Sequence, residues 1–158
     1  MIVPDYAAPA AVLVPHFYSD LTPLLEEIAV RTARTTGVIL LTREPALTEA
    51  FLAVQPDRKR YRVVTAPFDS PWLRDRAPVA VRTRAGMRWF VPRYRYQGRP
   101  RDNRLFWRIL ARGHPVLPVP YLPGGNLVVG ARGLVFVSRD VLRDNGLDEP
   151  GLHRHGAA

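Results

Sequence analysis

The sequence contains no cysteine, which excludes disulfide bonds, thiolate metal sites and a cysteine nucleophile within these 158 residues. Lysine is nearly absent as well, because Lys59 is the only one and the other 22 of the 23 basic residues are arginine. No apolar run approaches the roughly 18 residues of a membrane-spanning helix. The first residues also lack the basic and apolar regions of a signal peptide. We therefore expect a cytoplasmic protein without a membrane partner.

The formal net charge of +9 raises the question of nucleic-acid binding. Phosphate-binding surfaces usually mix lysine with arginine, and this chain hardly does so. Near-total replacement of lysine, together with 16 prolines, is typical of GC-rich coding sequence instead. A solvated, arginine-rich surface is the favoured interpretation, and a basic nucleic-acid-binding module stays the weaker alternative.

Apolar residues make up 47 % of the chain, enough to bury a core, so we expect one domain over residues 1–158. Its first part, residues 1–56, forms one α/β unit in this interpretation. A helix opened by Asp20 or Thr22 follows an apolar strand and ends at Gly37, and Pro56 stops a second helix. The predicted strands are residues 11–15, 38–42 and 61–65, and the second helix spans residues 44–54.

Residues 57–144 read as further units rich in strands. Arg84-Ala85-Gly86 joins two strands of a hairpin, and Asp102 can cap a helix that Gly113 ends. The hairpin strands are residues 79–83 and 87–91, and the other strands expected here are residues 116–122, 127–129 and 134–138. Residues 145–158 read as a disordered tail. The alternation of helices and hairpins predicts an α/β fold with mixed sheets.

Two segments depart from these patterns. Phe68–Pro78 follows a strand and contains several charged residues close together, and Leu122–Asn126 carries paired glycines between two apolar strands. Taken singly, the first is better explained by a surface turn with an Asp–Arg ion pair, and the second by a common Gly-Gly turn.

Together they resemble the signature of the agmatine deiminase and bacterial peptidyl-arginine deiminase family, in its N-terminal half. The resemblance rests on Trp72-x-Arg74-Asp75-x-x-Pro78 after Asp69-Ser70, and on the later Gly124-Gly125-Asn126, and it runs over about residues 60–140. It implies a partial pentein-type α/β propeller of about two to three ββαβ-like units. It also implies hydrolysis of a guanidine C–N bond, as in putrescine biosynthesis, without a cofactor.

The resemblance assigns roles to the residues of these two segments. Asp75 would be a carboxylate that holds a guanidinium group, because that planar cation is bound through paired N–H donors. Trp72 would pack on the substrate stem, Gly124, Gly125 and Asn126 would line the same site, and Arg74 and Pro78 would shape the loop. We expect Asp75 to lie at a strand end, partly buried, near Trp72 and Gly124-Gly125. Its positive partner is then either Arg74 or Arg76, the version we favour, or a cationic ligand if no internal arginine reaches it.

The sequence also departs from the family. Pro123 stands where the family has a glutamate, and the chain ends at Ala158, before the family's His-x-Asp pair and nucleophilic cysteine. His153 and His155 offer no replacement and no metal site, and His16 and His114 read as structural or exposed. No catalytic set is complete. We expect a catalytically incomplete deiminase-like protein, or else a half-enzyme completed by a second chain. Its expected partners are a guanidine or amine small molecule, and a second copy or second chain.

Overall fold

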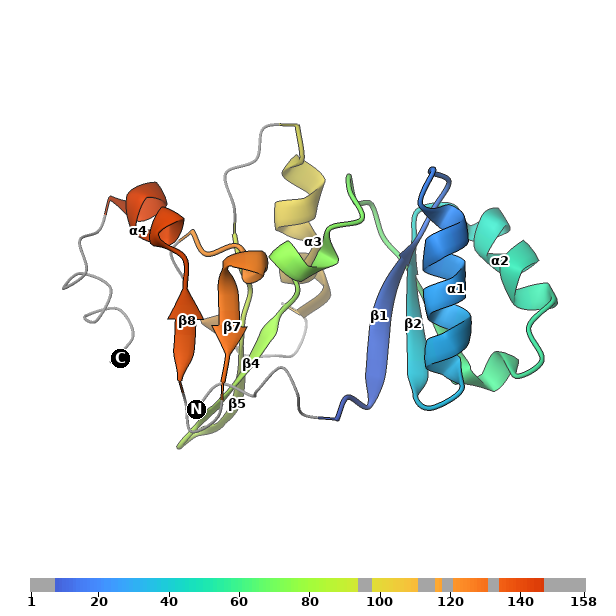
Figure 1. Cartoon of the computed structure of the whole chain (residues 1–158), viewed down its shortest axis with the longest axis horizontal. Coiled ribbons are helices and arrows are strands. Elements are labelled where there is room, and N and C mark those ends of the chain that lie inside the picture. The colour runs from blue at the N-terminus through green and yellow to red at the C-terminus, as the bar shows by residue number, and fades with distance from the viewer. Residues whose placement is uncertain (1–7, 94–97, 111–115, 118–120, 131–133, 147–158) are drawn as a thin grey trace. The chain divides into compact units, whose positions relative to one another are not determined.

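The computed structural model describes residues 8–93, 98–110, 116–117, 121–130 and 134–146. The described residues fall into two compact units, residues 8–71 and residues 72–146 (Figure 1). Over the described residues the chain is a mixed α/β protein with three small sheets, as the sequence predicted.

The first unit is a three-stranded parallel sheet whose strands are joined by helices. Its elements are β1 (Ala11–His16), α1 (Thr22–Ala33), β2 (Gly37–Thr42), α2 (Pro45–Ala53), the short 3-10 turn η1 (Arg58–Arg60) and β3 (Tyr61–Thr65). The sheet order is β1-β2-β3, with Leu40 of β2 opposite Val14 on one side and Val63 on the other. Parallel neighbours need a long crossover connection, and α1 and α2 supply it.

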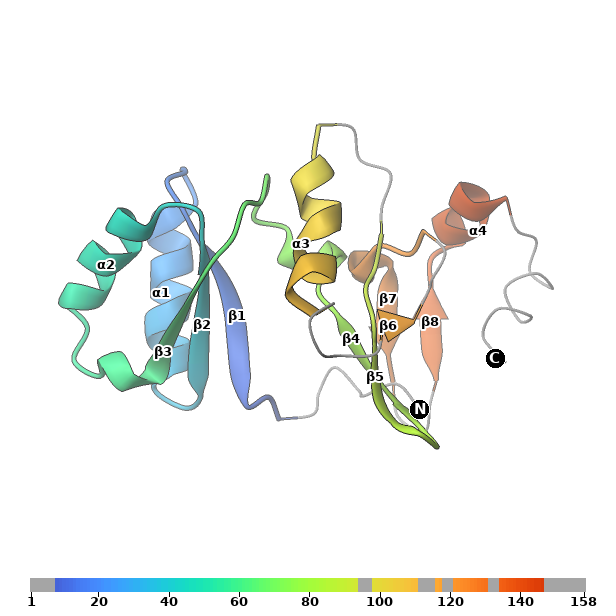
Figure 2. The same ribbon diagram turned by 180° about the vertical axis from the view of Figure 1, so that it is seen from behind.

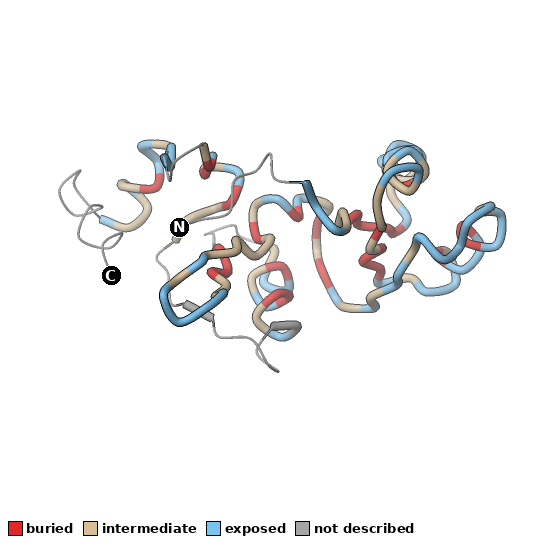
Figure 3. Tube along the Cα trace, turned by 90° about the horizontal axis from the view of Figure 1, so that it is seen from below, coloured by how far each residue is buried: buried red, intermediate tan, exposed pale blue. Residues whose placement is uncertain are grey.

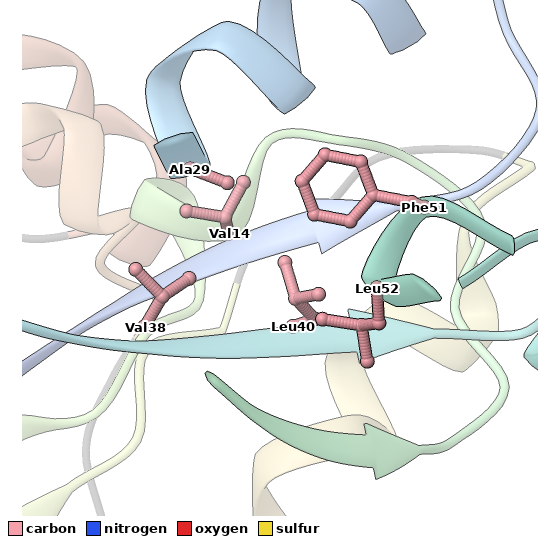
Figure 4. Packing of buried hydrophobic residues seen from close by; sticks show 6 residues of the cluster. All are labelled: Val14, Ala29, Val38, Leu40, Phe51 and Leu52. Atoms are coloured by element: carbon pink, nitrogen blue, oxygen red, sulfur yellow. The ribbon is translucent and has the colours of Figure 1, made fainter. Parts of the chain in front are cut away.

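The core of this unit lies between the sheet and both helices. Val38 and Leu40 are two residues apart on β2, so they point to the same face of the sheet. Ala29 of α1 and Phe51 of α2 pack against that face in one cluster (Figure 4). The buried members of the cluster are Val14, Ala29, Val38, Leu40, Phe51 and Leu52. Both helices therefore cover the same face.

Several boundaries of the first unit differ from those expected. β3 pairs with β2, although the sequence division assigned residues after 56 to the next group. α1 ends at Ala33, and Gly37 begins β2 instead of ending the helix. No side chain caps α1, because the apolar Leu21 stands at the cap position and Thr22 is already the first residue of the helix. The Thr22 hydroxyl donates to the carbonyl of Phe17 at 2.7 Å, outside the helix. The expectation of a single domain stays a prediction.

The second unit contains the remaining described elements (Figure 2). They are η2 (Leu73–Asp75), β4 (Val79–Thr83), β5 (Gly86–Phe90), α3 (Pro100–Leu110), β6 (Val116–Leu117), η3 (Gly124–Asn126), β7 (Leu127–Val129), β8 (Val135–Val137) and α4 (Arg139–Asn145). β4 and β5 form the predicted hairpin, β6 joins β5 in parallel, and β7 pairs with β8 in a second antiparallel hairpin.

The two helices of the second unit differ from the sequence interpretation. α3 begins at Pro100, so Asp102 lies inside its first turn and does not precede it as a cap. α4 was not predicted, and its last residue is Asn145, where the tail was expected to begin. The Asn145 side chain accepts from the backbone N–H of Tyr121 at 2.7 Å and donates to its carbonyl at 2.6 Å, which holds this helix in place. The rest of the expected tail, residues 147–158, lies outside the described residues.

The core of the second unit joins the hairpins. Phe90 of β5 packs with Leu127 and Val129 of β7, and all three residues are almost fully buried. Figure 3 shows buried and exposed stretches alternating along the chain. Because Leu127 directly follows η3, this core fixes the position of the Gly124–Asn126 turn. Over the described residues, no helix has the length and apolar character needed to cross a membrane.

Candidate functional site

Two 3-10 turns meet in the second unit, and they carry the residues singled out by the sequence. η2 is closed by hydrogen bonds from Asp75 N to the Trp72 carbonyl at 3.3 Å and from Ala77 N to the Leu73 carbonyl at 2.7 Å. η3 is closed by Asn126 N, which donates to the Pro123 carbonyl at 2.9 Å. The contacts between η2 and η3 confirm the expected convergence of the two segments.

The paired glycines allow this close approach. A Cβ atom on Gly124 would overlap the backbone carbonyl oxygen of Arg74, and one on Gly125 would overlap a carboxylate oxygen of Asp75. At position 124 only glycine fits without displacing the backbone of the opposite turn, and at position 125 a larger residue would displace the Asp75 carboxylate. The Gly-Gly pair therefore has a packing role that neither strand pattern nor turn propensity reveals.

The Asp75 carboxylate is fixed by the backbone of the opposite turn. Its Oδ1 atom accepts a hydrogen bond from the N–H of Gly125 at 3.2 Å, and the residue is half-buried. No ion pair involves Asp75 within the described part of the chain, and its Oδ2 atom accepts no hydrogen bond from that part. The half-burial matches the expectation. The strand-end position does not, because the chain tightens into η2 before β4 begins.

The neighbouring arginines point to other partners, so the expected pairing with Asp75 is wrong. Arg74 donates from Nη2 to the carbonyl oxygen of Leu127 at 3.0 Å, which ties η2 to β7. Arg76 is completely buried and pairs through Nη1 with Oδ2 of Asp102 at 2.6 Å. Asp102 is buried as well, and a buried guanidinium requires such a counter-charge. Of the two versions of the site, the described residues thus have the one in which no arginine pairs with the Asp75 carboxylate.

The other residues of the two motifs lie around the turns. Trp72 directly precedes η2 and is 54 % exposed, while Pro78, just before β4, is half-buried. Asn126 is half-buried, and its carbonyl accepts from Ser138 N at 3.2 Å. Pro123 brings no charge to η3, so the described part of these two turns offers one carboxylate, that of Asp75.

Sequence reasoning missed two buried polar arrangements. One is the pair of Arg76 with Asp102, whose only signal was the position of Asp102 at the start of a helix. The other is His16, which is completely buried, with Nδ1 at 2.9 Å from Thr48 Oγ1 and Nε2 at 3.1 Å from Glu26 Oε1. His16 is thus structural in the first unit, and His114, His153 and His155 lie outside the described residues. Among the residues that the structure describes, no three histidines or carboxylates gather as a metal site.

Comparisons with known proteins identify the fold. No protein-family model matches the sequence, and no curated protein matches it either. Among solved structures, an agmatine deiminase from C. jejuni is similar, with a TM-score of 0.76 at 16 % sequence identity, over 99 % of this chain and 53 % of that one. An agmatine deiminase of Enterococcus faecalis has a TM-score of 0.68 at 14 % identity, over 91 % of this chain and 46 % of that one.

A third similar structure belongs to a protein assigned as a peptidyl-arginine deiminase, with a TM-score of 0.78 at 16 % identity, over 97 % of this chain and 52 % of that one. This chain thus spans about half the length of the deiminases that it matches. At these identities the comparisons establish the fold, which is the one that the sequence resemblance implied. The chain has the mixed α/β pentein fold of agmatine deiminases and peptidyl-arginine deiminases, over a stretch equal to about half of those proteins.

Proposed function

We propose that this chain is a deiminase-like protein that binds a guanidinium or amine group at Asp75 and does not deiminate it by itself. The observation that carries the proposal is the state of the Asp75 carboxylate. It is half-buried, held at Oδ1 by the N–H of Gly125, and not neutralised by Arg74 or Arg76. A carboxylate of this kind attracts a cation from solution.

The geometry also supports the type of cation. A guanidinium group presents N–H donors in a plane, and the unoccupied Oδ2 atom of Asp75 can accept one of them. The exposed indole of Trp72, on the residue that precedes η2, offers an aromatic surface for an aliphatic stem or a cationic head. Pro123, just before Gly124, stands where the resemblance implies a second carboxylate. Asp75 alone would then hold the cation, so we expect weak binding.

The chemistry of deimination requires more than binding. A nucleophile must attack the guanidinium carbon, and an acid–base group must manage the protons of ammonia and water. These 158 residues contain no cysteine to provide a thiolate. We therefore expect no ammonia release above the buffer level from agmatine, arginine or arginyl peptides. Ammonia release that Asp75→Asn abolishes would overturn this part of the proposal.

Isothermal titration with agmatine tests the binding. We expect Asp75→Asn to weaken binding by about tenfold or more, since hydrogen bonds to charged groups contribute about 1.5–3 kcal/mol. The control is Asp20→Asn, which makes the same charge change at an exposed residue of the first unit. Equal affinity of the wild type and Asp75→Asn for agmatine would refute a role of Asp75 in binding.

A half-enzyme completed by a second chain is the second candidate, and it would need a surface on this chain for that partner. Exposed apolar side chains on the β7–β8 hairpin give a surface for such a partner, or for a second copy. Val128 and Phe136 stand opposite each other there and are 55 % and 62 % exposed. Analytical ultracentrifugation at rising protein concentration tests self-association. The half-enzyme is tested by co-expressing this chain with one that carries the cysteine and histidine, and by measuring deiminase activity.

A further inference from the structure

The first unit contains a cavity that the Asp75 site does not involve. Its volume is about 310 Å³, and its lining comes from the C-terminal end of α1, the segment after α2, η1 and the first residue of β3. This volume lies at the lower end of the range of small-molecule sites, roughly 300–1,000 Å³. All of its lining residues belong to the same compact unit.

One part of the cavity wall is apolar. Val30 and Ala33 lie on α1, at a spacing of three residues that places both on one side of the helix. Pro56 adds a rigid ring that follows α2. These groups offer contact to the hydrocarbon part of a ligand and give it no hydrogen-bond partner.

The charged part of the wall is positive in balance. Arg60 is paired with Asp57, with 3.4 Å between Nε and Oδ2, so their charges offset each other. Arg34 directly follows α1 and is exposed. Its guanidinium makes no hydrogen bond or ion pair with the residues that the structure describes. One guanidinium charge is thus available for a ligand that carries a single negative charge.

Polar groups at the side of the cavity can orient such a ligand. Gln55 donates from Nε2 to the carbonyl of Phe51 at 3.0 Å, which fixes its amide. Tyr61 lies 3.5 Å from Gln55 Oε1, the outer limit of a hydrogen bond, so its hydroxyl can turn to a closer acceptor. Burial and, to a smaller extent, the charge of Asp57 raise the pKa of Tyr61 above its ordinary value of 10.0. The hydroxyl therefore stays protonated and acts as a donor at neutral pH.

We propose that this cavity binds a small monocarboxylate with a compact apolar body. The carboxylate pairs with Arg34 and accepts a hydrogen bond from Tyr61, while the apolar body contacts Val30, Ala33 and Pro56. A guanidinium binds a carboxylate through two parallel N–H donors, which favours this anion over a neutral polar group of the same shape. The proposal is independent of the cation site at Asp75.

The test uses benzoate as the probe and benzamide as its neutral counterpart of the same shape. In NMR titrations of the whole chain, benzoate is expected to give saturable shifts at the backbone amides of Arg34 and Tyr61, and benzamide is not. Arg34→Gln is expected to weaken benzoate binding by at least about tenfold. The control is Arg31→Gln on the same helix, whose partner is Glu27 and which does not line the cavity.

Three outcomes would overturn the proposal. They are shifts that do not saturate with benzoate, equal binding of benzamide and benzoate, and equal losses of affinity in Arg31→Gln and Arg34→Gln. Because Arg31 and Arg34 are both exposed, neither substitution removes a core contact, so each variant is expected to fold.

Discussion

The buried ion pair between Arg76 and Asp102 should contribute strongly to the stability of the second unit. Both side chains are completely buried, and Nη1 lies 2.6 Å from Oδ2. The direct attraction is about 6 kcal/mol at an effective dielectric constant of about 20, but much of it offsets the loss of hydration. Asp102→Ala removes the carboxylate that pairs with the buried guanidinium of Arg76. We expect the free energy of unfolding to fall by about 3–5 kcal/mol.

Urea denaturation followed by tryptophan fluorescence measures this loss in the relevant unit, because Trp72, Trp89 and Trp107 all lie after residue 71. The control is Asp140→Ala on α4, where Asp140 pairs with Arg143 at 2.9 Å and the two side chains are 60 % and 76 % exposed. Such an exposed pair contributes about 0.2–1 kcal/mol.

A double variant separates the cost of breaking the ion pair from the cost of removing both charges. Replacing both residues by apolar ones, as in Arg76→Met with Asp102→Leu, should restore much of the stability lost by Asp102→Ala, because neither member of this pair is then buried without the other. The reasoning would be refuted if Asp102→Ala lowered the free energy of unfolding no more than Asp140→Ala does.

Three further perturbations test other contacts. Gly124→Ala should lower the free energy of unfolding by about 1–3 kcal/mol, since its Cβ overlaps the Arg74 carbonyl, as measured by urea denaturation. Thr48→Val keeps the side-chain shape but removes the partner of His16 Nδ1, so thermal and urea unfolding should show a loss of about 1–3 kcal/mol. Tyr61, with its raised pKa, favours the folded state while protonated, and this contribution is lost as the pH rises above 10.0 through the folded-state pKa. Tyr61→Phe should therefore reduce the loss of stability above pH 10.0, measured by denaturation on both sides of that pH.

Each of these perturbations has a matched control in the chain. Gly130→Ala meets only ordinary contacts among the described residues, the nearest at 3.6 Å, and should change stability by no more than about 0.5 kcal/mol. Thr35→Val removes an exposed hydroxyl that bonds its own helix end at 3.3 Å. Tyr18→Phe changes a side chain that is 80 % exposed. A loss in any control equal to that of its test variant would contradict the corresponding explanation.

Elements with strong local patterns could be predicted from the sequence. The apolar run of Val38–Thr42 predicted a buried strand, and the Arg84-Ala85-Gly86 turn predicted the hairpin of β4 and β5. The structure has both, with Gly86 at a φ of +108°. These features depend on neighbouring residues, so a short window of sequence contains their cause. α4 was missed although Gly146 follows it at a φ of +61°, because a helix of seven residues shows little periodicity.

The site could be predicted only in part. The approach of Asp75 to Gly125 followed from a family resemblance, since the two residues are 50 positions apart and no local pattern links them. Which partner each arginine binds could not be predicted from the sequence. Arg76 lies next to Asp75 in the chain yet pairs with Asp102, because burial of the guanidinium requires a counter-charge in the same interior.

The most direct test of a cation site at Asp75 is an agmatine titration followed at the backbone amide of Gly125. This N–H donates to Oδ1 of Asp75, so a cation that binds the carboxylate must change its environment. We predict a saturable shift of the Gly125 resonance in the wild type, and its loss in Asp75→Asn. A Gly125 resonance that does not respond to agmatine, or that responds equally in Asp75→Asn, would contradict the account.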